Sequence, residues 1–118
     1  MESERSSLQI MYKVEVYAAH EAFRQKDSTR AAEIFLKQGE IATKLYELEG
    51  TDTWDLRTYF AYNAAGWELE PIGNFETAST AYRLALDSCK RIAIGRSHEW
   101  QKNIEHLESM VERAESQV

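Results

Sequence analysis

Apolar residues recur every three to four positions along most of the chain, a spacing that places their side chains on one face of an α-helix. No segment keeps the strict alternation of apolar and polar residues that is typical of a β-strand. Short clusters of Gly, Pro, Asn, Asp and Ser interrupt the helical pattern at positions 26–28, 49–52, 71–74 and 95–97. The pattern therefore predicts an all-α protein with five helices.

The expected helices lie between these breaks and cover residues 7–25, 29–48, 53–70, 75–94 and 97–116, the last beginning at Ser97 or His98. Residues that can cap free backbone amides precede the second, third and fifth helices, namely Asp27 or Ser28, Thr51 or Asp52, and Ser97. We expect Gly50 and Gly95 to end two helices and Pro71 to end the third. Asp55, in the first turn of the third helix, suits the helix dipole.

Three helices have inward faces that can be assigned from the spacing. For the first helix we expect Leu8, Met11, Val14, Ala18 and Ala22, with Phe23 as a further candidate. For the second helix we expect Ala31, Phe35, Ile41, Ala42, Leu45 and Leu48. The fifth helix has one narrow apolar stripe, formed by Trp100, Ile104, Leu107, Val111 and Ala114. A narrow stripe buries one side of a helix only, so the fifth helix is expected to cap the others.

Composition narrows the class of protein. The 118 residues suffice for a single domain, 1–118, and three Trp, six Tyr and four Phe exclude general disorder. Fourteen basic and twenty acidic residues give a net charge of −6, which argues against nucleic acid or an anionic membrane as the main partner. No apolar run suggests a leader or a membrane span, so we expect a cytoplasmic protein. Cys89, the single cysteine, is expected to be a small buried residue rather than a reactive thiol.

The strongest internal signal is a stretch that begins with Gly73, Asn74 and Phe75 and continues with Ala78, Tyr82, Ala85 and Leu86. It resembles the second helix of a tetratricopeptide repeat, where a glycine-containing turn precedes a small residue, an aromatic residue and an Ala-Leu pair. Tyr62 and Gly66 fall at the large aromatic and small positions of the repeat's first helix. A weaker copy runs from Tyr12 to about Gly39, in which the residues that match Gly66, Ala78 and Tyr82 are Ala19, Ala31 and Phe35.

The resemblance implies two antiparallel helical hairpins, residues 7–48 and 53–94, stacked as a right-handed superhelix and closed by a capping helix at 97–116. Gly66 and Ala78 would remove bulk where two helices cross, and Tyr62 and Tyr82 would fill the space beside that crossing. The two copies are 47 residues apart, whereas the family repeat has about 34. Lys90 and Thr43 stand where the family usually has proline. Both departures fit a variant of the repeat with longer helices.

In the tetratricopeptide family the first helices of successive repeats line a concave groove. The resemblance therefore implies partner-binding positions at Lys13, His20, Phe60, Asn63 and Trp67, with Val16 and Phe23 beside them. For the three aromatic residues, Phe23, Phe60 and Trp67, the alternative is that they belong to the core. The carboxylate-clamping set of chaperone-binding repeats is not reproduced by Lys13 and Asn63, so that ligand is not implied.

Residues for catalysis or metal binding do not form a recognisable pattern. No two of the three histidines, His20, His98 and His106, are three or four residues apart, so we expect no metal and no cofactor. Carboxylate pairs such as Glu105 with Glu108 fit the solvated face of an amphipathic helix. We therefore expect a non-enzymatic adaptor, co-chaperone-like or regulatory subunit that binds a peptide or a partner helix.

Two alternative functions and one rival fold remain open. The chain can be a structural or assembly subunit whose helix faces pair in a homo-oligomer. It can be a small helical inhibitor or immunity protein, which its size and charge of −6 favour weakly. A rival fold is a three-helix bundle of the microtubule-interacting-and-trafficking type over the first half of the chain. That fold leaves the repeat-like residues between Tyr59 and Leu86 without an explanation.

Overall fold

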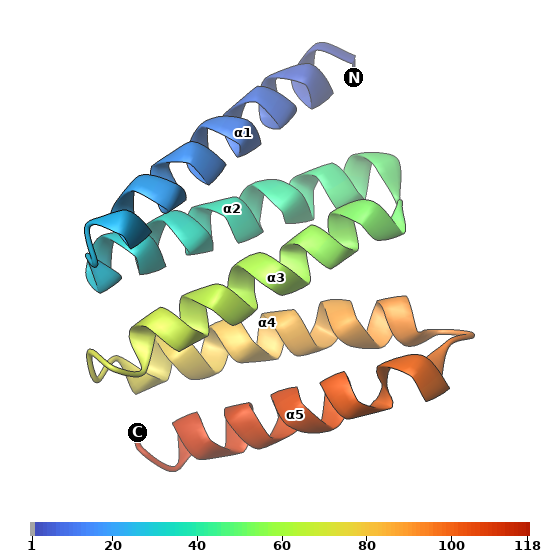
Figure 1. Cartoon of the computed structure of the whole chain (residues 1–118). Helices are drawn as coiled ribbons and strands as arrows, with labels where there is room; N and C mark the ends of the chain where they lie inside the picture. Colours follow the sequence, from blue (N-terminus) through green and yellow to red (C-terminus); the bar gives the residue numbers. More distant parts are fainter. Residues whose placement is uncertain (1) are drawn as a thin grey trace.

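The computed structural model describes residues 2–118 of the chain. These residues form five α-helices and no strand: α1 (Glu2–Arg24), α2 (Ser28–Glu49), α3 (Asp52–Leu69), α4 (Phe75–Ala93) and α5 (Ser97–Glu115) (Figure 1). The predicted all-α class is thereby confirmed. The predicted helix ends lie close to the observed ones except in α1, which begins at Glu2 instead of Ser7.

Side chains and glycines at the breaks explain where the helices begin and end. Asp27 caps α2 by accepting a hydrogen bond of 3.1 Å from the backbone amide of Arg30. Asn74 caps α4 in the same way. Gly50 ends α2 with a φ of 65°, a left-handed conformation that glycine adopts without steric cost. Helix α3 is preceded by the predicted cap residue Thr51, which makes no side-chain cap bond. Helix α5 is preceded by Arg96, which was not predicted as a cap and also makes none. The side chain predicted to cap α5, that of Ser97, lies outside the described ones.

The helices form a row of antiparallel neighbours, in which each helix packs mainly on the helices before and after it in the sequence (Figure 1). The molecule measures 43 × 39 × 21 Å, so it is thin in one direction. Aromatic contacts also join alternate helices. Tyr12 of α1 lies 5.2 Å from Trp54 of α3, and Tyr59 of α3 lies 6.0 Å from Trp100 of α5, measured between ring centroids. Helices α1, α3 and α5 therefore share one side of the row, which we call the odd face.

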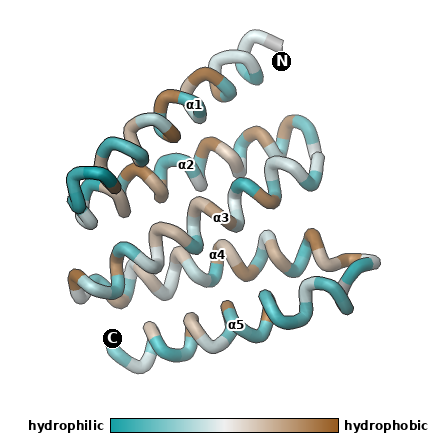
Figure 2. Tube along the Cα trace, viewed as in Figure 1, coloured by the Kyte–Doolittle hydropathy of each residue, from teal (hydrophilic) through white to brown (hydrophobic). Residues whose placement is uncertain are grey.

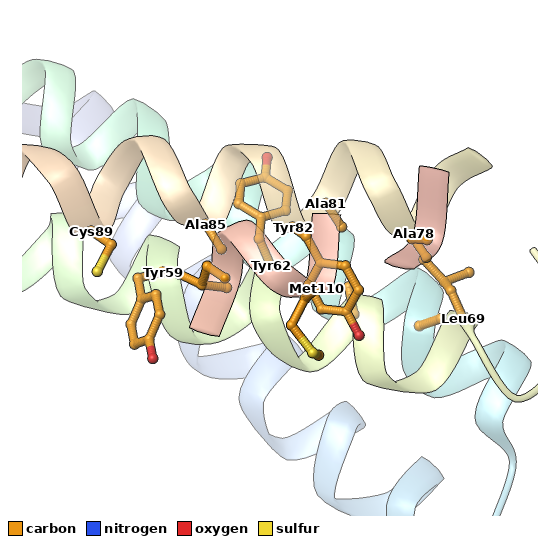
Figure 3. Close-up of a cluster of buried hydrophobic side chains, with 13 residues drawn as sticks. Tyr59, Tyr62, Leu69, Ala78, Ala81, Tyr82, Ala85, Cys89 and Met110 are labelled. Atoms are coloured by element: carbon orange, nitrogen blue, oxygen red, sulfur yellow. The ribbon is translucent and has the colours of Figure 1, made fainter. Parts of the chain in front are cut away.

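The main core lies between α3, α4 and α5 (Figure 3). Helix α4 presents a line of small buried residues there, namely Ala78, Ala81, Ala85 and Cys89. Tyr82 is fully buried on the same helix, and a methyl group placed on Gly66 of α3 would lie within 2.7 Å of three of its ring carbons. Tyr62 of α3 packs on Gly39 of α2 with the same closeness. Two tyrosine rings thus lie directly against helix backbone, which brings the three helices α2, α3 and α4 close together.

Two polar clamps tie α3 to its neighbours, one at each end. At its beginning, buried Asp55 accepts hydrogen bonds of 2.8–3.2 Å from the guanidinium of Arg91 in α4. At its end, Glu70 accepts from the hydroxyl of Tyr82 at 2.5 Å and from Arg113 of α5 at 2.6 Å. Burial alone would raise the pKa of Glu70, but the hydrogen bonds from Arg113 and Tyr82 outweigh it and lower that pKa. Burial and the neighbouring carboxylate raise the pKa of Tyr82.

Several predicted core positions were wrong, most of them in α1. Met11, Val14 and Phe23 are exposed by 46%, 58% and 65%, and Leu48 at the end of α2 is also exposed. The reason is that α1 ends the row and packs mainly on one neighbour. Its buried face consists of Leu8, Ala19 and Ala22. Helix α5 covers the core as predicted, but its stripe also includes Met110, which is buried and which the prediction omitted.

Candidate ligand-binding groove

A groove runs along α1 on the odd face, and three pockets mark its course. The first, of about 530 Å³, lies between α1 and α3 and is lined by Gln9, Tyr12, Lys13, Val16, Tyr17, Trp54 and Arg57. The second, of about 390 Å³, is lined by Val16, Ala19, His20, Phe23, Phe35 and Gln38 of α1 and α2. A smaller third pocket continues past Phe23 to the turn between α1 and α2. Because Val16 and Phe23 are each shared by two pockets, we treat the three as one α1–α3 groove.

Helical geometry explains why these side chains line the groove. Lys13, Val16, His20 and Phe23 follow one another at spacings of three and four, so they project from the same side of α1. Trp54 and Arg57 stand one turn apart on α3 and face α1 across the first pocket. On the far side of the α1–α2 pair, a separate shallow pocket is lined by Glu15, Ala18, Arg30, Glu33, Ile34 and Lys37. The α1–α3 groove is therefore distinct from the opposite surface of the same hairpin.

Three side chains form the wall of the first pocket. The rings of Tyr12 and Trp54 meet edge to face at an interplanar angle of 88°. The guanidinium carbon of Arg57 lies 4.4 Å from the centroid of Trp54 and 5.6 Å from that of Tyr12. Both distances fall within the range of cation–π attraction. Trp54 is buried, and the exposed Arg57 side chain places its guanidinium over the Trp54 ring beside the pocket. Burial raises the pKa of Tyr12, and the charge of Arg57 offsets part of that rise.

The second pocket is mainly apolar. Phe23 is 65% exposed and stands at one end of the pocket, while half-buried Phe35 of α2 contributes another aromatic ring. Gln38 is buried in α2 and donates a hydrogen bond of 3.0 Å to the backbone carbonyl of Glu15. This bond satisfies the side-chain amide and anchors α1 on α2. The pocket can therefore receive an apolar side chain without leaving Gln38 unpaired.

Of the five predicted partner-binding residues, two line the α1–α3 groove and three do not. Lys13 and His20 line the α1–α3 groove. Phe60 and Trp67 are exposed by 57% and 55% on α3, so the alternative assignment of these residues to the core, like that of Phe23, is wrong. They do not line the three pockets. Asn63 is half-buried, and its Oδ1 atom is buried without a hydrogen-bond partner in the described structure.

Sequence reasoning missed Tyr12, Trp54 and Arg57 as groove residues. The contact that unites them joins positions more than forty residues apart, and no periodic pattern reports such a pairing. A local signal did exist, because Arg57 follows Trp54 by three residues and so shares its side of the helix. That spacing alone does not show which neighbouring helix the pair would face.

We also searched the described part of the chain for metal ligands, a reactive thiol and membrane-spanning helices. Among residues 2–118, no group of three or more His, Cys, Asp or Glu side chains is placed to hold a metal ion. Cys89 is buried as predicted, and burial raises the pKa of its thiol, which keeps it in the less reactive protonated form. None of the helices that the structure describes has the length and apolar character needed to cross a membrane.

Comparison of the chain with protein-family models, with curated proteins and with solved structures found no match.

Proposed function

We propose that this protein is a non-enzymatic interaction module that binds a peptide or a partner helix in the α1–α3 groove. One observation carries the proposal: α1 and α3 expose large aromatic side chains that the core does not use. Phe23 lines the groove, and Phe60 and Trp67 stand on the same odd face, each more than half exposed. Aromatic residues supply much of the binding energy at protein interfaces, since they bury a large area at a small cost in conformational entropy.

We further propose that the hairpins α1–α2 and α3–α4 are tetratricopeptide-like and that α5 is their cap. The close packing of Tyr82 on Gly66 beside fully buried Ala78 supports this proposal for the second hairpin. In the first hairpin, Ala19 and Ala31 are buried in one cluster with Phe35 packed against it, at the matching positions. In this scheme α1 and α3 are the first helices of successive repeats, which makes the odd face the ligand-binding side.

The test uses peptides recovered from a random twelve-residue display library on the immobilised chain, with affinities measured by fluorescence anisotropy. The groove variant is His20→Ala with Phe23→Ala. Both side chains are exposed, so we expect the melting curve to stay nearly unchanged and peptide binding to weaken about tenfold or more. The control is Glu33→Ala with Lys37→Ala, on the opposite side of the hairpin, which should leave affinity unchanged. Equal loss in the control, or no loss in the groove variant, would contradict the groove assignment.

A second candidate, a homo-oligomeric assembly subunit, is favoured by exposed apolar residues of α1 that adjoin the groove. Ile10, Met11 and Val14 are exposed apolar residues of α1, and Tyr17, which also lines the first pocket, is exposed by 78%. Figure 2 shows apolar (brown) segments along the trace of α1. At the other end of the row, the outward residues of α5 are polar, among them Gln101, Lys102, Glu105, His106, Glu108 and Glu112. In this scheme two copies pair these exposed residues of α1 across a two-fold axis, because one self-complementary patch is enough for a closed dimer.

Sedimentation equilibrium at several protein concentrations tests this second candidate. Ile10 and Val14 line none of the groove pockets, so Val14→Asp should disrupt a dimer without touching the groove. The matched control is Ile94→Asp, which places the same charge at an exposed apolar position after α4. A wild-type protein that sediments as a monomer at all concentrations would remove this candidate.

A further inference from the structure

The first pocket of the α1–α3 groove carries positive charge that the protein does not neutralise. Lys13 and Arg57 both line it, whereas its other lining residues are Gln9, Tyr12, Val16, Tyr17 and Trp54. Neither cation forms an ion pair with the side chains that the structure describes. Of the other twelve basic residues, seven are each paired with a carboxylate, namely Arg5, Arg24, Lys37, Arg83, Arg91, Arg96 and Arg113, and five are in no ion pair of the described residues. In a chain with a net charge of −6, the first pocket therefore combines two cations that form no ion pair with a lining that contains no acidic residue.

The position of Arg57 makes this charge available to a ligand. Its guanidinium stands over the ring of Trp54 at 4.4 Å, and Trp54 is itself buried. Arg57 donates none of the side-chain hydrogen bonds of the described residues, so its N–H groups remain free to donate to a ligand. Because the group is already positioned, a carboxylate that binds it need not immobilise a flexible arginine side chain. Lys13 adds a second charge from the α1 side of the same pocket.

The charged pocket is continuous with the apolar one, since Val16 lines both. Lys13 and His20 are seven residues apart on α1, a separation of about 10 Å along the helix axis. An extended peptide covers that distance in about three residues. A ligand that spans both pockets therefore has an acidic group and a large apolar side chain about three residues apart.

We propose that the groove binds an acidic segment of a partner protein. This inference rests on the function proposed above. A carboxylate of that segment pairs with Lys13 and Arg57, and an aromatic or aliphatic side chain about three residues away occupies the pocket of Val16, His20 and Phe23. The proposal is supported by charge complementarity between the two cations of the first pocket and the carboxylates of such a segment. Nucleic acid fits less well, because two cations match one or two anionic groups, whereas the net charge of −6 repels a long polyanion.

The experiment measures which feature of the display-selected peptides the protein requires. Each recovered peptide is synthesised twice, once as selected and once with every Asp and Glu replaced by Asn and Gln. Affinities are measured by fluorescence anisotropy for the full chain and for the variants Lys13→Glu and Arg57→Gln. The matched control is Lys90→Glu, which makes the same charge change at an exposed residue of α4 outside the groove. A single-stranded twelve-nucleotide DNA is the competing polyanion.

We expect the acidic peptides to bind at least about tenfold more tightly than their amide versions, and to lose that preference in Lys13→Glu but not in Lys90→Glu. Binding should also weaken as the NaCl concentration rises from 50 to about 500 mM. Peptides that depend on His20 and Phe23 but bind equally well as amides would overturn the acidic preference and leave the groove function intact. Recovery of no groove-dependent peptide would overturn both. Tighter binding of the DNA, with the same loss in Lys13→Glu, would overturn the choice of a protein partner.

Discussion

The ring of Tyr82 occupies the space beside Gly66 that any larger residue would need. A methyl group on Gly66 would approach three ring carbons of Tyr82 to within 2.7 Å, which is closer than van der Waals contact allows. Glycine inside a helix costs about 1 kcal/mol relative to alanine, so this glycine is explained by the contact it permits. Because Tyr82 also bonds to Glu70, its ring has little freedom to move away. The contact therefore determines how closely α3 and α4 approach.

Replacement of Gly66 by alanine tests this relationship. On helix propensity alone, Gly66→Ala would stabilise the protein. We expect it instead to destabilise the fold by about 1–3 kcal/mol, because the new methyl group forces Tyr82 or the helices apart. Urea denaturation at pH 7 measures the change. The double variant Gly66→Ala with Tyr82→Leu should lose less than the sum of the two single effects. A more stable Gly66→Ala protein would show that the helices are not held at this distance.

The Glu70 clamp predicts a pH dependence of stability. The pKa of Glu70 is lowered in the folded protein from its ordinary value of 4.5. The ionised carboxylate therefore stabilises the fold fully above that ordinary value, and this contribution disappears as the pH falls through the lower, folded-state pKa. We expect Glu70→Gln to lower the free energy of unfolding by about 1 kcal/mol at pH 7 and to have a smaller effect near pH 3. The free energy of unfolding, measured in urea from pH 7 to 3, checks this expectation.

The Asp55–Arg91 pair predicts an asymmetry between single and double substitutions. Asp55 is buried, and Arg91 is its charge partner, with Ser88 supporting the guanidinium. Arg91→Met leaves a buried carboxylate without a cation, and we expect a loss of about 2–4 kcal/mol. Adding Asp55→Leu removes the stranded charge and should recover part of that loss. If the double variant is less stable than Arg91→Met by the full cost of Asp55→Leu alone, the two residues are not energetically coupled.

The α3–α4 hairpin could be predicted from the sequence because its signals are local. Gly73 and Asn74 mark the turn, and the resemblance to the tetratricopeptide repeat implies that Ala78 and Tyr82 lie at the crossing with Gly66. The same reasoning failed in α1, where apolar residues surround the middle of the helix and the period does not distinguish the buried side from the exposed one. Leu8 was predicted correctly, whereas Met11 and Val14 were not.

The sequence patterns did not predict the side-chain contacts between residues that are far apart in the sequence. Asp55 was interpreted as a partner of the helix dipole, because its actual partner, Arg91, lies 36 residues away. For the candidate site, the resemblance to the repeat implies the groove side of α1, including Lys13 and His20. The opposite wall was not predicted, because the stacking of Arg57 with Trp54 and Tyr12 depends on how α1 and α3 meet. Helical periodicity gives the faces of each helix, but not the pairing of alternate helices.

The odd face between α1 and α3 is the proposed ligand-binding side. The most direct measurement is the change in backbone amide chemical shifts of the isotope-labelled full chain when a display-selected peptide is added. We expect the largest changes at residues 9–23 of α1 and at Trp54 and Arg57 of α3, with little change at Glu33 or Lys37 on the opposite surface. Changes confined to α4 and α5, or to the opposite surface of the α1–α2 pair, would contradict the account.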